Sequence, residues 1–213
     1  MISGTEHLPD FGGYESWQQN GMSCLVDGNY EIDSYSSFWQ NPVENGTISA
    51  GCWSYPDGGL HLGLDIASAM YSDVLAVANG IVLYAHALVD SNNGYLGNWC
   101  GWPNGGGNTI CMVVAVNDRL YAISYAHLSN EIYVTSGQQV SQGTVIAKSG
   151  NSGNSTGPHT HVEVFELKQD LNSIVEYFRN SGADFSFGCG YSEAATCSGY
   201  ACRIDPETVL EGV

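Results

Sequence analysis

The chain is 213 residues long, a length typical of one domain built around one sizeable core. Its 5 Lys and Arg residues against 22 Asp and Glu residues give a formal net charge of −17. A field of that sign repels phosphate backbones and anionic lipids, so the composition argues against nucleic-acid binding and against adsorption to a membrane. No apolar run reaches membrane-spanning length, which argues against direct membrane insertion.

Residues 1–41 are polar and aromatic and show no sustained hydrophobic period. We therefore expect an irregular N-terminal leader that packs on the main domain. Met1–Glu6 has neither the basic nor the apolar region of a signal peptide. This start leaves three options open: the chain stays inside the cell, leaves it by another route, or belongs to a longer protein.

Residues 42–168 consist of short apolar runs separated by glycine turns, which predicts a mainly β domain with an antiparallel sheet. Asn79-Gly80 and Asn117-Asp118 each separate two such runs and predict two tight hairpins. The expected strands cover residues 74–78, 81–85, 109–116, 120–126, 132–134, 144–148 and 161–167.

Two segments depart from the strand pattern. Residues 86–107 form a long connection rich in Gly, Asn and aromatic residues. We expect it to be either the wall of a binding groove or an ordinary insertion folded over its own tryptophans. Residues 169–213 form a C-terminal extension rich in cysteine, and apolar residues at helical spacing over 167–179 predict one amphipathic helix at its start.

The cysteines favour disulfides over a metal or redox motif. There are 7, an odd number, and none occurs in Cys-x-x-Cys, so a zinc ribbon or thioredoxin-like site is not indicated. Cys189, Cys197 and Cys202 crowd into a Gly- and Ser-rich stretch, which favours stapling and an oxidising compartment. We also hypothesise that Cys100 and Cys111 form a disulfide that pins the insertion to the strand after it.

Two short segments carry residue types suited to a metal. His159 and His161 are two residues apart on an expected strand, so their side chains face one side, about 7 Å apart. They can share an ion, or one can bind it while the other faces a substrate. An extended path would separate His61 and Asp65 by about 13 Å, so the chain must bend at Gly63 for both to reach one ion. Two imidazoles and one carboxylate suit Zn²⁺ and leave a fourth tetrahedral position for water.

Three segments, in this order along the chain, closely resemble the lysostaphin-type M23 metallopeptidases. They are Gly59–Ala67 (GLHLGLDIA), Tyr125–Leu128 (YAHL) and Ser155–Glu163 (STGPHTHVE). The resemblance extends over about residues 42–165. Thr160 stands where the family more often has Leu, but it is also a β-former and we expect no loss of geometry. The run Cys52–Pro56 and the long connection at 86–107 also depart from the family, and these two bear on substrate preference, not on the reaction.

Carried over position by position, the resemblance implies that His61, Asp65 and His161 hold one Zn²⁺ and that His127 and His159 are the catalytic pair. It implies an antiparallel β domain with a long substrate groove. It also implies a zinc-dependent endopeptidase that cuts the stem peptide or the interpeptide cross-bridge of bacterial peptidoglycan. The reaction would be attack by a zinc-activated water assisted by the two histidines.

Two features of the sequence allow other interpretations. Glu163 is expected either to orient a neighbouring imidazole or to be an exposed strand carboxylate. Gly153–Gly157 (GNSTG) matches the nucleophile elbow of serine hydrolases, but Pro158 and a strand pattern follow it where that motif needs a helix.

The main rival function is a non-catalytic peptidoglycan-binding or hydrolase-regulating module on the same scaffold. Such relatives typically lack ligands or catalytic histidines, whereas all five positions are filled here, so we favour the enzyme. The expected partner is peptidoglycan, and the expected location is extracellular or at the cell wall, reached by secretion or within a phage or conjugative lytic apparatus. Tethered cell-wall-binding domains of a longer parent protein are a further option.

Overall fold

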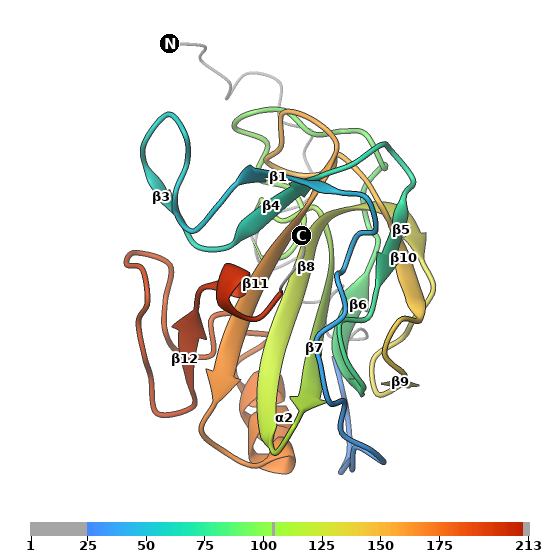
Figure 1. Ribbon diagram of the computed structural model, residues 1–213, viewed down its shortest axis with the longest axis vertical. Coiled ribbons are helices and arrows are strands. Elements are labelled where there is room, and N and C mark those ends of the chain that lie inside the picture. Colours follow the sequence, from blue (N-terminus) through green and yellow to red (C-terminus); the bar gives the residue numbers. More distant parts are fainter. Residues whose placement is uncertain (1–24, 104, 211–213) are drawn as a thin grey trace.

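The computed structural model describes residues 25–103 and 105–210, and antiparallel strands dominate this part of the chain (Figure 1). The strands are β1 (Thr47–Ala50), β2 (Trp53–Ser54), β3 (Leu60–His61), β4 (Leu64–Ala67), β5 (Asp73–Leu75), β6 (Gly80–His86), β7 (Asn108–Val116), β8 (Arg119–Ile132), β9 (Gln139–Val140), β10 (Val145–Ser149), β11 (His159–Leu167) and β12 (Ala201–Ile204). Helix α2 (Leu171–Asn180) and the short 3-10 helix η2 (Pro206–Thr208) complete the described elements. The predicted fold class, mainly β with an antiparallel sheet, is confirmed.

One large sheet carries nearly all of these strands. Its central order is β1-β4-β11-β8-β7-β6-β9, while β12 pairs with β11, and β10 pairs with both β5 and β8. The strands β2 and β3 form a separate small hairpin. Among the described residues, no helix is both long enough and apolar enough to cross a lipid bilayer.

The two predicted hairpins have different outcomes. Asn117-Asp118 joins β7 and β8, which pair antiparallel with Val116 opposite Arg119, so this prediction is confirmed. The hairpin at Asn79-Gly80 is wrong, because β5 pairs with β10 while β6 pairs with β7 and β9. Gly80 is needed for a close approach of strands: a Cβ there would lie 2.2 Å from the carbonyl oxygen of Val113.

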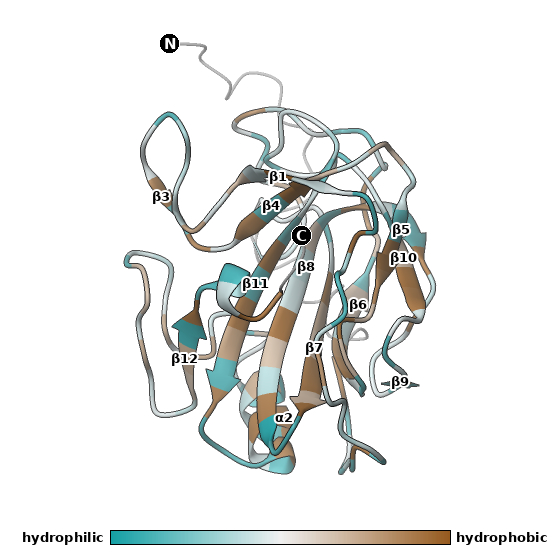
Figure 2. Ribbon diagram, in the orientation of Figure 1, coloured by the Kyte–Doolittle hydropathy of each residue, from teal (hydrophilic) through white to brown (hydrophobic). Residues whose placement is uncertain are grey.

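Both faces of the central sheet are covered, so its strands are apolar on both sides. Along β7, Ile110, Met112 and Val114 join one hydrophobic cluster with β4, β8 and β11, whereas Cys111 and Val113 join a second cluster. Figure 2 accordingly shows hydrophobic residues along most of β7 and an alternating pattern along β8. Such near-continuous burial explains why period-2 alternation is weak in this strand.

Helix α2 packs on the second cluster through the apolar face that the sequence predicted. Its buried residues are Leu171, Ile174, Val175 and Phe178. The helix begins four residues later than expected because β11 continues to Leu167 and Asp170 caps it. The Asp170 carboxylate accepts hydrogen bonds from the backbone N–H groups of Asn172 and Ser173.

Truncating Phe178 to alanine is expected to lower the free energy of unfolding by about 3–5 kcal/mol, because its fully buried ring leaves a cavity between helix and sheet. Urea unfolding followed by circular dichroism measures this. The control is Glu176→Ala, an exposed position on the same helix, which is expected to change stability by at most about 0.5 kcal/mol. A loss below about 1 kcal/mol for Phe178→Ala would contradict the packing described.

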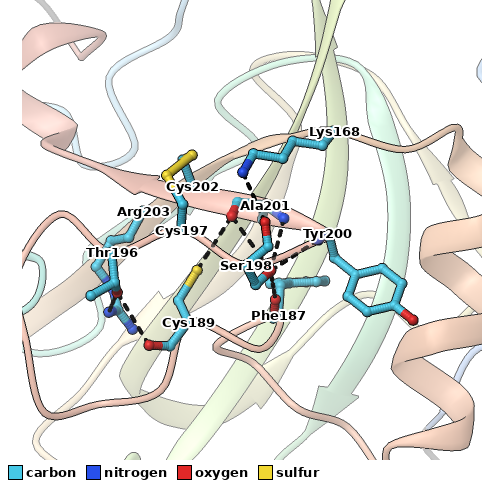
Figure 3. The surroundings of a disulfide bond; sticks show 10 residues. All are labelled: Lys168, Phe187, Cys189, Thr196, Cys197, Ser198, Tyr200, Ala201, Cys202 and Arg203. Atoms are coloured by element: carbon cyan, nitrogen blue, oxygen red, sulfur yellow. Dashed lines mark hydrogen bonds between the residues drawn. A yellow bond between two sulfur atoms is a disulfide. The ribbon is translucent and has the colours of Figure 1, made fainter.

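The states of the cysteines differ from one of the hypotheses drawn from the sequence. Cys100 and Cys111 are both free thiols, so the disulfide expected between them is wrong. The alternation along β7 directs Cys111 into the cluster beneath α2, whereas Cys100 packs beside Val89 in the insertion. The disulfide in the described residues joins Cys197 to Cys202 in the C-terminal extension (Figure 3).

Candidate active site

Three predicted ligand residues converge where β3, β4 and β11 meet. His161 on β11 lies directly opposite Asp65 on β4 in the antiparallel register. The Asp65 Oδ1 atom is 2.8 Å from His161 Nδ1 and 3.1 Å from His61 Nε2, and the two imidazole nitrogens are 3.1 Å apart. The structure therefore brings together three ligand atoms that come from positions up to 100 residues apart.

The chain bends between His61 and Asp65 as the sequence required. Strand β3 ends at His61 and β4 begins at Leu64, so Gly63 lies in the bend. A Cβ at Gly63 would lie 2.4 Å from the carbonyl oxygen of Val162 and 2.7 Å from His161 Nε2. Only a residue without a side chain lets the bend pass this close to β11.

The donor set fits a small divalent cation. Ligand atoms bonded to Zn²⁺ at about 2 Å in a tetrahedron are about 3.3 Å apart, close to the separations among the three side chains. The remaining ring nitrogens are held by other groups: His61 Nδ1 is 2.8 Å from the carbonyl oxygen of Gly51, and His161 Nε2 is 3.5 Å from Glu163 Oε1. A proton on each of these nitrogens directs the opposite, unprotonated nitrogen toward the shared point.

The electrostatics of this cluster favour an ionised carboxylate. Burial opposes the charge on Asp65, but hydrogen bonds with His161 and His61 outweigh it and hold the carboxyl pKa well below its ordinary range. Burial also opposes protonation of His161, yet Asp65 and Glu163 raise its pKa to about 10. A proton on that ring competes with a cation for the same lone pair, so cation binding would release it.

The other two predicted histidines lie beside the cluster. The ring centroids of His127 on β8 and His159 on β11 are 4.7 Å apart, and His127 is 6.0 Å from the His161 ring. His127 Nδ1 is 2.8 Å from the Ser152 carbonyl oxygen, and His159 Nδ1 is 2.8 Å from the Gly157 carbonyl oxygen. Burial lowers the pKa of both imidazoles, that of His127 to about 3 with the neighbouring histidines adding to the effect. Both rings are therefore neutral at pH 7.

A β-bulge directs His127 into the site. Ile110 lies opposite Tyr125 and Asn108 opposite Leu128, so β8 has one residue more than β7 between these pairs. His127 adopts a φ of 59°, in the left-handed region that non-glycine residues seldom occupy. Its backbone N–H donates to the carbonyl oxygen of Gly106 in the insertion at 2.8 Å. Bulges commonly re-aim a side chain at a functional site, and this one could not be found from sequence.

All five of these residues lie within a segment that matches a known protein family. Residues 59–173 match Peptidase family M23. The chain belongs to this family.

Three relatives illustrate what this M23 protein is similar to. It is 30% identical over 169 residues to glycyl-glycine endopeptidase ALE-1 of Staphylococcus capitis, covering 78% of this chain and 40% of that protein. It is 32% identical over 114 residues to peptidoglycan DD-endopeptidase ShyA of Vibrio cholerae, covering 54% of this chain and 22% of the relative. The solved catalytic domain of lysostaphin from Staphylococcus simulans is 28% identical, with a TM-score of 0.46, and covers 62% of this chain and 93% of that domain. The chain thus spans less than half the length of both curated relatives.

In this M23 protein a groove of about 510 Å³ runs past His61, His127 and His161. Its walls come largely from outside the central sheet: the insertion contributes Trp99, which is 53% exposed, and the C-terminal extension contributes Tyr191. The structure thus favours the groove-wall interpretation of residues 86–107 over an insertion folded only on itself. Tyr55 also lines the groove, and its ring stacks on His61 with a centroid separation of 4.2 Å.

Glu163 is not an exposed strand carboxylate. Its side chain is 12% exposed, and its Oε1 atom faces His161 while its Oε2 atom accepts from Arg203 Nε at 3.1 Å. The contact between the carboxylate and the imidazole agrees with the orienting interpretation. Arg203 was not identified from the sequence as a partner of this site. The only indication in the sequence is that Arg203 is one of 5 basic residues in a strongly acidic chain.

Replacing Gly63 with alanine is expected to weaken zinc binding at least tenfold, because the new methyl group must push β11 and the His161 ring away from His61. Competition with a chromophoric chelator measures the zinc affinity. The control is Gly199→Ala, where a Cβ would meet nothing within 4 Å. Equal affinities for the two variants and the wild type would show that the bend tolerates a side chain.

Proposed function

We propose that this protein is a zinc-dependent endopeptidase that hydrolyses peptide bonds in bacterial peptidoglycan. The observation that carries the proposal is the convergence of three potential ligand atoms, all within 4.8 Å of one another, with the His127 imidazole on the same groove and the His159 ring beside it. The relatives' names support the substrate class, since one is a glycyl-glycine endopeptidase and another a peptidoglycan DD-endopeptidase. These two names differ in the bond cut, so both the cross-bridge and the stem peptide are candidates.

His61, Asp65 and His161 would hold the zinc ion in this proposal. Zinc bound by such residues polarises the scissile carbonyl group and makes water a better nucleophile at neutral pH. Three protein ligands would leave one position of a tetrahedral zinc ion for water or substrate, as in catalytic zinc sites.

His127 and His159 would move the protons. Each ring is neutral, and its Nδ1 atom is held against a backbone carbonyl oxygen, so the lone pair is on Nε2. Each imidazole can therefore accept a proton from the attacking water first and donate only afterwards, to the oxyanion or to the leaving amine. Burial suits the first role, because a neutral imidazole is already the base form at pH 7.

The site of action follows from the substrate. Peptidoglycan lies outside the cytoplasmic membrane, so the protein would act extracellularly or at the cell wall. With a net charge of −17 it is not attracted to anionic wall polymers, and substrate selection would come from the groove or from additional domains. The greater length of the curated relatives is consistent with the second source.

Digestion of purified muropeptides tests the proposal. Substrates from walls with different cross-bridges are incubated with the zinc-loaded protein, and fragments are identified by mass spectrometry. The expected result is a new pair of termini at one peptide bond, in the cross-bridge or in the stem peptide. Binding to walls without any cleavage would favour the non-catalytic peptidoglycan-binding module instead.

A further inference from the structure

The positively charged side chain of Arg203, on β12 of the C-terminal extension, is buried behind the cluster formed by His61, Asp65 and His161. The Arg203 side chain has 0% exposure, and the residue lies outside the segment 59–173 that matches the family. Taking a guanidinium out of water is costly unless charge and hydrogen bonds compensate for it. The groups that compensate for the buried charge of Arg203 therefore show what this side chain does next to the candidate metal site.

The partners of Arg203 hold its guanidinium on several sides. Arg203 Nε donates to Glu163 Oε2 at 3.1 Å, and an Nη atom donates to the Gly190 carbonyl oxygen at 2.9 Å. The guanidinium carbon is 4.9 Å from the ring centroid of Phe165 and 5.7 Å from that of Tyr191. These contacts fix the direction in which the cation faces β11.

The extension folds around this side chain. The backbone N–H of Arg203 donates to the carbonyl oxygen of Thr196 at 2.9 Å, and the disulfide between Cys197 and Cys202 closes the turn between them. Figure 3 shows Arg203 next to Thr196 and to this disulfide. The segment that carries Arg203 is thus tied covalently to the loop that surrounds it.

Glu163 connects Arg203 with a proposed metal ligand. One carboxylate oxygen takes the Arg203 hydrogen bond, and the other is 3.5 Å from His161 Nε2. A proton on Nε2 leaves the lone pair of His161 on Nδ1, which is the atom that faces Asp65 and His61. A carboxylate that is anchored from behind can fix both the tautomer and the tilt of that ring.

We propose that Arg203 is a positioning residue of the metal site: it anchors Glu163, and Glu163 orients His161 toward the ion. The inference rests on the proposed function only in taking the ion to be zinc. With this role for Arg203, the C-terminal extension not only lines the groove but also supports the metal site.

Zinc affinity of purified full-length variants tests this inference, measured by competition with a chromophoric chelator. Glu163→Gln and Arg203→Met are each expected to bind zinc about 10- to 100-fold more weakly than the wild type. The double variant is expected to lose little more than either single variant, because both substitutions interrupt one chain of contacts. In cobalt-loaded protein, the visible absorption bands are expected to shift in Glu163→Gln.

The matched control is a second ion pair whose carboxylate also lies on β11. Arg119 Nη1 and Glu166 Oε1 are 2.6 Å apart, but the pair is exposed and Arg119 begins β8 at the end opposite His127. Arg119→Met and Glu166→Gln are expected to keep zinc affinity within about twofold and the cobalt spectrum unchanged, since exposed pairs contribute little.

The outcomes separate this inference from the proposed function. If Arg203→Met does not fold, Glu163→Gln and Arg203→Lys are used to test the positioning role. Folded variants with wild-type zinc affinity and an unchanged cobalt spectrum would overturn that role. A wild-type protein that binds zinc but cleaves no peptidoglycan would overturn the proposed function alone. A wild-type protein that binds no zinc would overturn both.

Discussion

Replacing His127 with alanine is expected to lower kcat/KM for peptidoglycan cleavage by about 10²- to 10⁴-fold, the usual contribution of a general acid–base group. The imidazole is buried, neutral and held by Ser152, so its Nε2 atom is available to accept a proton at neutral pH. Because His127 is not among the three clustered ligand residues, zinc content is expected to remain one ion per chain. Initial rates on a defined muropeptide, together with metal analysis, measure both quantities.

The control for this variant is His86→Ala. His86 lies on β6, which β7 separates from β8; it does not line the groove, and it hydrogen-bonds with Tyr84. Its removal is expected to leave kcat/KM within about twofold of the wild type. Wild-type activity in His127→Ala would remove His127 from the mechanism, whereas loss of zinc would assign it a structural role at the metal site.

Removal of zinc with a strong chelator is expected to abolish cleavage without unfolding the protein. The two hydrophobic clusters are formed mainly by residues of the sheet, α2 and their flanking segments, and they include none of the three candidate ligand residues. At a free zinc concentration 100-fold above its Kd, bound zinc contributes about 2.7 kcal/mol to folding. For a chain of this length, that corresponds to a fall in Tm of roughly 5–10 °C in the chelated protein.

Adding one equivalent of Zn²⁺ is expected to restore both activity and Tm, whereas Mg²⁺ is expected to restore neither. Mg²⁺ prefers oxygen ligands in an octahedron, and the cluster offers two imidazole nitrogens and one carboxylate. Scanning calorimetry and rate measurements on the same samples check the prediction. Full cleavage by chelated protein would be incompatible with a metal-dependent reaction.

Residues whose role depends on local spacing could be placed from the sequence. The alternation of His159 and His161 predicted that both would face one side of a strand, and both rings lie at the same site. The bend at Gly63 followed from the distance that Asp65 and His61 had to cross. The hairpin at Asn117-Asp118 and the apolar face of α2 were equally local and were found.

Features that depend on contacts between residues far apart in the sequence could not be predicted from the sequence. Asn79-Gly80 has the sequence of a tight turn, but the close approach of Val113 is what requires the glycine. The bulge at His127 depends on the register between β7 and β8, which no local pattern specifies. Arg203 and Glu163 are 40 residues apart, and their pairing exists only because β12 adds to the edge of β11.

The insertion has a consequence for altering which peptides are accepted. In this insertion Leu96 is 73% exposed and Trp99 lines the groove, whereas the carbonyl oxygen of Gly106 near its end accepts a hydrogen bond from the backbone N–H of His127. Under the proposed function, one loop therefore contacts both the substrate groove and a residue of the proton-transferring pair. We therefore expect loop exchanges that stop before Cys100 to change which peptides are accepted, and exchanges that run through Gly106 to slow turnover as well.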